Sequence, residues 1–407
     1  MTANRHQSGR RLSPPWWMAL LVLIGLTAAA DAKQHLVQPG LSWSHLDRTL
    51  RPGDEIILMP GVHRPANLDL VHGTPQRPIT IRGLDPRRPS RIDADRYGIR
   101  LVRPAYVRLE NIEIIGASIH GLVVDGSAKP LDESRLDADP SRGITIQNVT
   151  IKRTGPRGTR HAMVIRHVND VQIESGTIES WAGSGIEVIG CRNVDIREMT
   201  LRGSEDADQR SGIRVRAGSA QVTIERCLIE NAGHQAICVG GKSSESEWQT
   251  PLGADTDAAS VFEASSVYIS DCTLIGGLCS VALCHAEHVN VQQSTLIRPR
   301  DAVISIRRPQ NDPRFGALET SSFGNCLIAW EDGDVVRLLH LGRGATADQL
   351  FLESNLWWGA EATKAMDALG PFPGTIALPQ VTDIDPQLDE RWRPQNPAAE
   401  AYGVPAS

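Results

Sequence analysis

Apolar and polar residues alternate along short segments through most of this chain. The clearest run, residues 212–233, begins Gly-Ile-Arg-Val-Arg and, after a turn, continues Val-Thr-Ile-Glu-Arg-Cys-Leu-Ile-Glu-Asn. Residues 185–203 and 161–183 carry the same unit. Because a period of two sends successive side chains to opposite faces, these segments are predicted to be β-strands rather than helices. Weaker copies of the unit start at Gly98, Gly121, Ala236, Ser280 and Ala302.

The repeat indicates how these strands assemble. Its period is about 23–27 residues, which is typical of a solenoid. One unit cannot bury its apolar side alone, but stacked units share a continuous core. The sequence therefore predicts an all-β fold: a single-stranded, right-handed parallel β-helix of about ten rungs. Residues 42–50 read as a short amphipathic helix that covers the open N-terminal end of the core.

Composition is consistent with this interpretation. The 407 residues contain 36 glycines but only 4% aromatic residues, as expected for a narrow aliphatic core with tight corners. A formal net charge of −6 gives no sign of a nucleic-acid-binding surface. The length could hold several domains, but the repeat favours one. Residues 33–360 are assigned to the β-helix and residues 361–407, where the repeat fades, to a capping segment and tail.

Residues 1–32 have the features of a targeting segment. A basic start is followed by an apolar run over residues 16–30, and Ala30-Asp31-Ala32 fits a small-x-small cleavage site. We expect a cleaved signal peptide and a periplasmic or secreted protein. The alternative is an uncleaved anchor, which would be the chain's only contact with a membrane.

Seven cysteines in an exported chain raise the question of disulfides. Cys227, Cys272 and Cys326 fall at one inward position of successive units. Stacked strands lie about 4.8 Å apart, so a bridge between neighbours is geometrically possible. Buried thiols in a hydrophobic ladder are the preferred interpretation. No Cys-x-x-Cys pair or His/Cys metal spacing is present.

Three long insertions interrupt the repeat at one equivalent place. They cover residues 127–142, 242–262 and 309–320, each between a Gly-Ile-x-Val type of strand and the strand that follows it. We therefore expect all three to rise from the same corner of the solenoid. Loops gathered on one edge of a rigid scaffold form the walls of a groove.

Charged side chains alternate with apolar ones in the strands beside that corner. Stacking predicts one outward column through Arg100, Val123, Val164, Glu187, Arg214 and Cys238. A second column runs through Val102, Asp125, Arg166, Ile189, Arg216 and Gly240. The candidate catalytic residues are His161, Glu187, Arg214, Arg216 and His234. The candidate substrate-binding residues are His120, Asp125, Arg166, Asp206, Asp208 and Arg210.

This mixture of histidine, carboxylate and arginine suits an acidic sugar. A guanidinium binds a uronate carboxylate with two parallel hydrogen bonds, and the neutralised carboxylate makes its α-proton easier to remove. A base could then take that proton for β-elimination, with His161 or His234 as proton-transfer candidates. The alternative is that Glu187 and Arg214 are cross-rung neighbours that form only an ion pair on a solvated face.

The two ends of the chain carry motifs of a known group. Residues 51–63 read Arg-Pro-Gly-Asp-Glu-Ile-Ile-Leu-Met-Pro-Gly-Val-His, and residues 72–83 read His-Gly-Thr-Pro-Gln-Arg-Pro-Ile-Thr-Ile-Arg-Gly. Asp385-Pro386-Gln387-Leu388 and Gln395-Asn396-Pro397-Ala398 lie near the C-terminus. This opening and closing resemble pectin-lyase-like β-helix proteins, especially the chondroitinase-B and alginate lyase group. The resemblance implies the same fold over roughly residues 35–403 and an acidic polysaccharide as partner.

The resemblance carries over unevenly to the catalytic strands. The group's "Arg-His-Gly" strand is matched by Arg216-Ala217-Gly218, which supplies the arginine. Its "Glu-Ile-Ile-x-x-Lys" strand corresponds to residues 185–190, where Gly190 stands in place of the lysine. The acidic "Glu-x-Glu" that helps hold calcium in that group is missing. We therefore expect no cofactor, and calcium is implied only by the resemblance.

Polygalacturonase hydrolases of the same fold offer a second comparison. Asp206 and Asp208, followed by Gly233-His234, are similar to their paired aspartates and "Gly-His-Gly". Paired carboxylates serve inverting hydrolysis. The first hypothesis is thus an exported carbohydrate-active protein that acts on a uronate-containing polysaccharide by lyase-like β-elimination. The alternatives are a non-catalytic β-helix that binds glycan or a cell-envelope partner, and a polygalacturonase-like hydrolase.

Overall fold

A computed structural model describes most of the chain after the targeting segment. The described residues are 32–127, 141–155, 157–204, 209–249, 260–331, 337–359, 376–377 and 382–405. Lys33 onward forms one compact unit, separate from Met1–Ala32. The predicted signal peptide lies, except for Ala32, outside the described residues. Within them, no helix is both long and apolar enough to cross a membrane.

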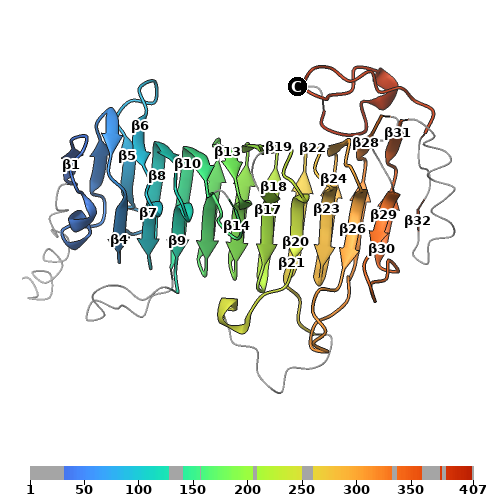
Figure 1. Ribbon diagram of the computed structural model, residues 1–407, viewed down its shortest axis with the longest axis horizontal. Coiled ribbons are helices and arrows are strands. Elements are labelled where there is room, and N and C mark those ends of the chain that lie inside the picture. Colours follow the sequence, from blue (N-terminus) through green and yellow to red (C-terminus); the bar gives the residue numbers. More distant parts are fainter. Residues whose placement is uncertain are drawn as a thin grey trace, which may run out of the picture. The chain divides into compact units, whose positions relative to one another are not determined.

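The described chain coils into stacked rungs whose strands pair in parallel on three faces (Figure 1). One face is a ten-stranded sheet, which confirms the expected number of rungs. Its strands are β4 (Ala66–Asp69), β7 (Tyr97–Val102), β9 (His120–Asp125), β11 (Met163–Arg166), β14 (Gly183–Ile189), β17 (Gln209–Arg216), β20 (Gln235–Gly240), β23 (Cys279–Cys284), β26 (Ala302–Arg307) and β29 (Arg337–Leu341). The predicted right-handed parallel β-helix is confirmed.

The other two faces are continuous because two long strands, β8 (Ala105–Ile115) and β10 (Arg142–Thr154), run through both. The face that follows the ten-stranded sheet contains β1 (Gln34–Val37), β2 (Glu55–Leu58), β5 (Ile79–Gly83), β12 (Asn169–Glu174), β15 (Arg192–Arg197), β18 (Ser219–Glu225), β21 (Ala264–Ser270), β24 (Ala286–Gln292), β27 (Ser321–Gly324), β30 (Leu350–Glu353) and β32 (Ile376–Ala377). The third face contains β3 (Gly61–His63), β6 (Ser90–Asp93), β13 (Thr177–Trp181), β16 (Thr200–Arg202), β19 (Leu228–Glu230), β22 (Thr273–Ile275), β25 (Thr295–Ile297), β28 (Leu327–Ala329) and β31 (Leu356–Trp358).

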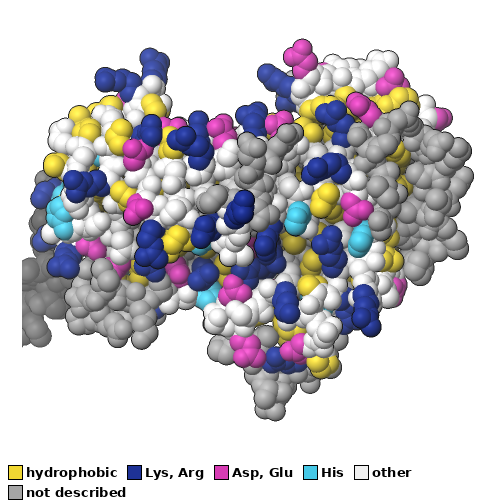
Figure 2. Space-filling model, viewed as in Figure 1, with side chains coloured by type: hydrophobic (Ala, Val, Ile, Leu, Met, Phe, Trp, Pro, Cys, Tyr) yellow, Lys and Arg dark blue, Asp and Glu magenta, His cyan; other side chains and the backbone are white. Residues whose placement is uncertain are grey.

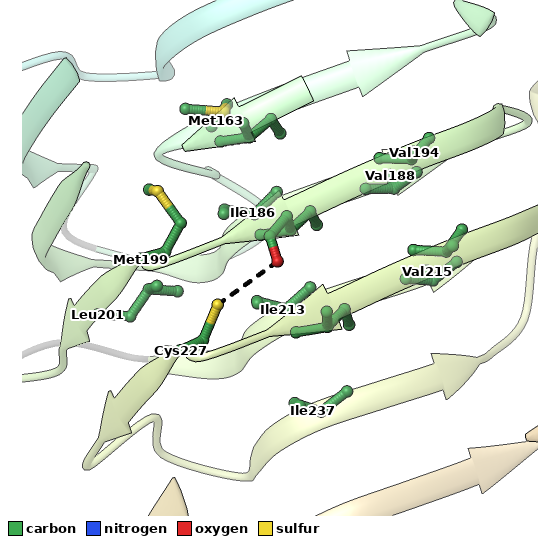
Figure 3. Close-up of a cluster of buried hydrophobic side chains, with 14 of the residues drawn as sticks. Met163, Ile186, Val188, Val194, Met199, Leu201, Ile213, Val215, Cys227 and Ile237 are labelled. Atoms are coloured by element: carbon green, nitrogen blue, oxygen red, sulfur yellow. Dashed lines mark hydrogen bonds between the residues drawn. The ribbon is translucent and has the colours of Figure 1, made fainter. Parts of the chain in front are cut away.

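Alternation along the strands fills the core as predicted. Ile186, Ile213 and Ile237 are fully buried and lie above one another in register, because each pairs with the next rung (Figure 3). Burying one such side chain stabilises the fold by roughly 1.5–3 kcal/mol. The same position therefore contributes again in every rung, and the core is one continuous column.

One corner of the coil depends on a left-handed backbone residue in rung after rung. The residue between the second and third faces has φ between 45° and 56° in nine rungs. The nine residues are Asn111, Asn148, Ser175, Glu198, Arg226, Asp271, Gln293, Asn325 and Ser354. The next residue then points inward, and in three rungs it is Cys227, Cys272 or Cys326. All seven cysteines are buried and free, so the thiol interpretation is confirmed.

The N-terminal end carries the predicted short cap, but its helix is shorter and of a different type. In place of a helix over residues 42–50, a short 3-10 helix, η2 (Ser44–Arg48), follows strand β1. It lies along the free edge of β4, where the Ser44 hydroxyl and the Asp47 carboxylate accept hydrogen bonds from the main-chain N–H groups of Asn67 and Asp69, at 3.1 and 3.0 Å. Polar side chains thus satisfy the donors of the terminal strand, while Leu46 and Leu50 pack against the core.

The long insertions rise from the corner after the ten-stranded sheet, as predicted (Figure 1). Much of residues 127–142 and 242–262 is outside the described residues. The described parts around the 3-10 helix η4 (Glu245–Glu247) and residues 309–320 pack on each other. The rings of Trp248 and Phe315 lie 5.7 Å apart, and Gln310 donates a 2.5 Å hydrogen bond to Glu263. The two insertions therefore form one substructure beside the sheet.

The C-terminal residues lie against the third face. Ala399, within the 3-10 helix η5 (Pro397–Ala399), is buried with residues of four rungs, among them Ile297 and Leu356. The main-chain N–H of Gly403 donates to the carbonyl of Asn325 at 2.8 Å. The described tail thus covers the side of several rungs. β32 adds a strand beside β30 after residue 360.

Candidate functional site

The outer surface of the ten-stranded sheet carries the predicted columns. Register places Arg100 opposite Val123, Val123 opposite Val164, Val164 opposite Glu187, and Glu187 opposite Arg214. In the second column Asp125 lies opposite Arg166 and Ile189 opposite Arg216. Both columns are confirmed. The repeat pattern was sufficient to fix them because a period-two strand has no freedom to choose which side chain faces outward.

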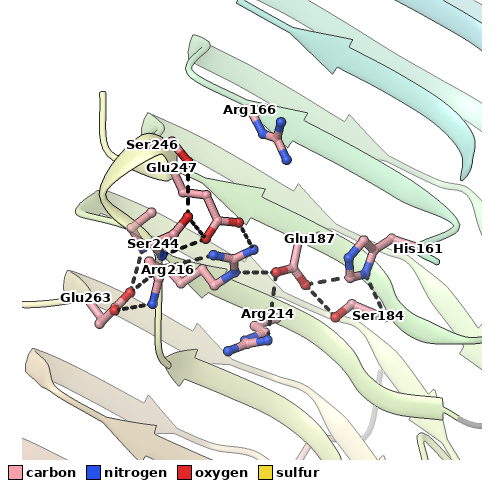
Figure 4. Close-up of polar contacts among 12 residues, drawn as sticks. His161, Arg166, Ser184, Glu187, Arg214, Arg216, Ser244, Ser246, Glu247 and Glu263 are labelled. Carbon is pink, nitrogen blue, oxygen red and sulfur yellow. Dashed lines mark hydrogen bonds and ion pairs between the residues drawn. The ribbon is translucent and has the colours of Figure 1, made fainter. Parts of the chain in front are cut away.

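Glu187 is the centre of a polar cluster on this surface (Figure 4). Its side chain is completely buried. The Ser184 hydroxyl donates to its Oε2 and the Arg216 Nε donates to its Oε1, both at 2.5 Å. Arg214 Nη1 lies 4.0 Å from Oε1 and His161 Nδ1 lies 3.6 Å from Oε2. Glu187 therefore organises the cluster but cannot itself touch a polymer on the surface.

Arg216, a candidate catalytic residue in the sequence, is held from both sides. Besides Glu187, it donates from Nη1 to the Ser243 hydroxyl at 3.0 Å and from Nη2 to Glu247 at 2.6 Å. Ser243 in turn is bonded through its main-chain N–H and hydroxyl to the buried Glu263, at 2.7 and 2.6 Å. The insertion thus closes over Arg216, whose side chain is only 9% exposed. Arg216 ties the insertion to the sheet.

The charges of this cluster hold its acidic groups ionised. Burial acts to raise the pKa of Glu187, but His161 once protonated in acid, the charges of Arg216 and Arg214, and the hydrogen bond from Ser184 lower it to about 2. The carboxylates of Glu247 and Glu187 in turn raise the pKa of the Arg216 guanidinium, against the opposing effect of burial. At neutral pH Glu187 is a buried anion.

His120 and His161 are neutral members of the same surface. Their rings stack at 5.3 Å with 14° between the planes. The main-chain N–H of His161 donates to His120 Nδ1, and that of Ser184 donates to His161 Nδ1, both at 2.9 Å. Each Nδ1 is therefore an acceptor, which assigns the neutral ring's proton to Nε2. Burial lowers the pKa of both rings, to about 4 for His120.

Arg214 and Arg166 are the cations of the cluster that reach solvent. Their side chains are 25% and 35% exposed. Arg166 lies 3.8 Å from the Asp125 carboxylate, which also accepts hydrogen bonds from the main-chain N–H and hydroxyl of Ser127. The Nε atoms of Arg166 and Arg214 are buried without a hydrogen-bond partner among the described residues. Part of each guanidinium side chain is nevertheless open to solvent on the outer face.

Other predicted site residues lie apart from this cluster. His234 and Arg210 are exposed, and no hydrogen bond or ion pair among the described residues joins them to Glu187. His234 precedes Gln235, which lies opposite Ser211, so it sits one residue out of register with the His120–His161 pair. Among the described residues, no hydrogen bond or ion pair brings His234 to His161. Asp206 and Asp208 lie outside the described residues.

Sequence reasoning missed four residues that build the cluster. Ser184 stands three residues before Glu187, a spacing that gave no signal by itself. Ser243 and Glu247 belong to an insertion with no repeat, and Glu263 directly follows it, so no register could place them. Only the folding of the insertion back onto the sheet brings them to Arg216.

Gly190 stands where the chondroitinase-B and alginate lyase group has its lysine, and the space beside it is occupied. Gly190 has φ +59°, and a Cβ built there would lie 2.6 Å from the His167 ring. That ring bonds through Nε2 to the Glu247 carbonyl at 2.7 Å. Among the described residues, no group of three or more His, Cys, Asp or Glu side chains gathers as a metal site.

Comparison with known proteins supports the architecture. The A-module of mannuronan C-5 epimerase AlgE4 from Azotobacter vinelandii superposes with a TM-score of 0.51 at 11% identity, covering 82% of this chain and 91% of that one. An alginate lyase from Paenibacillus sp. str. FPU-7 gives a TM-score of 0.44 at 12% identity, covering 79% and 99%. No curated protein sequence matches. At these identities the likeness concerns the fold.

A family model described as "Right handed beta helix region" matches residues 97–249 and 136–315. The two overlapping matches extend over more than half of the 407 residues. The chain therefore belongs to the right-handed β-helix family.

Proposed function

We propose that this protein is a carbohydrate-active β-helix that receives an acidic, uronate-containing polysaccharide on the outer face of its ten-stranded sheet. The observation that supports this most is the pair of partly exposed guanidinium groups, Arg166 and Arg214, on either side of the buried Glu187. Carboxylates are the natural partners of such groups, because guanidinium–carboxylate hydrogen bonds are charge-assisted and geometrically matched. Figure 2 agrees, since Lys and Arg side chains gather across the middle of the view.

The finer activity we propose is lyase-like β-elimination. Arg214 would bind the carboxylate of the reacting uronate and stabilise the charge that grows on it while a water molecule at the open face takes the α-proton. The bond from the β-carbon to the glycosidic oxygen would then break, and that oxygen would take a proton from solvent. His161 would contribute as a neutral donor through Nε2, because its Nδ1 already accepts the Ser184 N–H. A neutral imidazole that polarises a carbonyl oxygen is an established catalytic role. Glu187 would hold Arg214 and Arg216 in place from below the surface.

The test is incubation of the full-length mature protein with alginate, pectate and chondroitin. Elimination creates an unsaturated uronate, which is followed by ultraviolet absorbance, and every cleavage creates a reducing end. Arg214→Ala should reduce the rate by at least about tenfold, the effect of losing one charged hydrogen bond in the transition state. Arg108→Ala, which removes an exposed arginine from another face, should leave the rate unchanged. An unaltered rate in Arg214→Ala would refute the assignment.

A non-catalytic, glycan- or envelope-binding β-helix is the second candidate, and one observation favours it. Nδ1 of both His120 and His161 is occupied by a main-chain donor, so neither ring offers a free lone pair as a base. Gly190 moreover replaces the lysine of the resembled group. Binding to uronate polymers without any product would select this candidate. Reducing ends without unsaturated uronate would instead select a hydrolase.

We also propose that the protein acts outside the cytoplasm, after removal of residues 1–32. Support comes from the sequence of that segment. Fractionation of expressing cells and N-terminal sequencing test it. A mature chain starting at Lys33 in the periplasm or medium is expected, whereas an intact N-terminus in the membrane fraction would indicate an anchor.

A further inference from the structure

An open pocket lies at the N-terminal end of the face that carries Arg214. It has a volume of about 410 Å³ and is lined by β4, β7, the corner before β7, and η2. The lining residues are Ser44, Pro65, Ala66, Asn67, Asp95, Arg96, Tyr97 and Arg100. Nothing in the proposed chemistry uses it.

Register connects this pocket to the polar cluster. Asn67 lies opposite Arg100, and Arg100 begins the outward column that continues through Val123 and Val164 to Glu187. Three rung spacings of about 4.8 Å separate Arg100 from Glu187, or roughly 14 Å. Pocket and cluster are therefore two places on one strip of surface, a few sugar units apart.

The strip between them has the character of a sugar-binding surface. The rings of Tyr97 and His120 lie 5.9 Å apart, and that of His161 follows 5.3 Å further on. Val123 and Val164 form an apolar cluster with Tyr97 beside this row of rings. Val123, Val164 and His161 are buried, so a sugar chain on this strip would contact the partly exposed Tyr97 and His120 and the polar groups at its two ends.

The pocket provides cations for a carboxylate. Arg96 is exposed and Arg100 is half-buried, and neither forms an ion pair with any described residue. The Arg96 guanidinium lies 5.9 Å from the Tyr97 ring centroid. Asp95 is the one acidic side chain in the lining. Two unpaired guanidinium groups in a concave site suit an anion of about one sugar in size.

The pocket also lies where the strip ends. β4 is the terminal strand of the ten-stranded sheet, and η2 closes its free edge through the Ser44 and Asp47 hydrogen bonds. Ser44 and Pro65 line the pocket on that side. A polymer lying along the strip from Arg214 would meet this wall.

We propose that the pocket binds the terminal uronate of the polysaccharide, with Arg96 and Arg100 on its carboxylate and Tyr97 against its ring. This inference rests on the proposed function, because it takes the same polymer on the same face. It adds that the face receives a chain end. That end then fixes which sugar lies at Arg214, whereas a face without such a pocket would bind any stretch of the polymer.

Fluorescence anisotropy or calorimetry with size-defined oligouronates tests the pocket. Arg100→Ala should weaken binding of oligomers long enough to span both places by about tenfold, the loss of one charge-assisted hydrogen bond. It should leave binding of a disaccharide at the Arg214 cluster nearly unchanged. Arg96→Ala serves as a second variant at an exposed position, and Arg108→Ala is the matched control on another face. Thermal unfolding of each variant excludes loss of fold.

A bulky label distinguishes a chain end from the interior. Oligomers labelled at one end should bind as the unlabelled oligomer does, while those labelled at the other end should bind at least about tenfold more weakly. If Arg100→Ala matches Arg108→Ala, or if both labels are tolerated equally, the pocket assignment is wrong and the proposed function stands. If the wild-type protein binds no oligouronate of any length, the proposed function itself is wrong, and this inference is overturned with it.

Discussion

Replacing Glu187 by glutamine should destabilise the protein far more than replacing a surface glutamate. Glutamine keeps the shape but removes the buried negative charge that Arg216 and Ser184 contact at 2.5 Å. The pKa of Glu187 falls from its ordinary value of 4.5 to about 2 in the fold. At 1.36 kcal/mol per unit, this corresponds to about 3 kcal/mol of stabilisation. Removing one partner of a buried pair costs a similar amount, about 3–5 kcal/mol.

Urea unfolding at pH 7, followed by tryptophan fluorescence, measures this effect. Glu198→Gln is the matched control, because Glu198 pairs with Arg226 at 3.3 Å on the surface and its side chain is 47% exposed. Such a pair contributes at most about 1 kcal/mol. Since a stacked-repeat protein need not unfold in one step, the unfolding midpoints and rates of the two variants are compared directly with the wild type.

The pH dependence provides a second reading. The folded pKa of Glu187 is depressed, so its stabilising contribution is complete above the ordinary value of 4.5 and is lost as the pH falls toward about 2. Wild type and Glu187→Gln should therefore differ most at neutral pH and converge in acid. If Glu187→Gln and Glu198→Gln lose equal stability at pH 7, or if their difference persists at pH 2, the reasoning about a buried organising anion is refuted.

Three further predictions follow from the same surface. Gly190→Lys restores the residue of the resembled group. It should lower the free energy of unfolding by about 1–2 kcal/mol without adding lyase activity, because φ is +59° and the His167 ring occupies the space. Urea unfolding checks the first result and the unsaturated-product assay the second. In an NMR titration, His120 should stay neutral through pH 6.5 and protonate only near pH 4, since burial lowers its pKa; an ordinary midpoint would contradict its buried, main-chain-bonded position. In the native protein thiol reagents should react slowly, with Cys238 first, because a hydrogen bond with Cys284 lowers its pKa to about 7; a rapid reaction of any other cysteine would contradict its burial.

The fold was predictable because each rung repeats the same local information. Period-two alternation assigned Ile186 and Ile213 to the core and Glu187 and Arg214 to the outside, and the structure confirms each assignment. The corner from which the insertions rise was predictable for the same reason. Neighbouring rungs pair in the same register, so one clearly recognised repeat predicts the equivalent positions in the rungs beside it.

The N-terminal helix and His234 show where this local information ends. Apolar spacing suggested an amphipathic helix over residues 42–50, but the terminal strand β4 needed hydrogen-bond acceptors for its free N–H groups, and η2 supplies them. In the repeat, His234 lies one residue before the position that His120 and His161 occupy in their own rungs. His234 lies in the turn before β20 (Gln235–Gly240), where strand alternation does not fix the direction of a side chain, so the pattern could not bring it to His161.

The sequence alone determined the coil, its register and the two columns of outward side chains, because these depend on contacts between equivalent residues of adjacent rungs. Only the tertiary structure decided which of those side chains meet solvent. The insertion that carries Ser243 and Glu247 folds back over Arg216, buries it with Glu187, and leaves Arg214 and Arg166 at the surface. No periodic pattern encodes that contact, since it joins a repeating element to a non-repeating one and is fixed by hydrogen bonds between residues far apart in the chain.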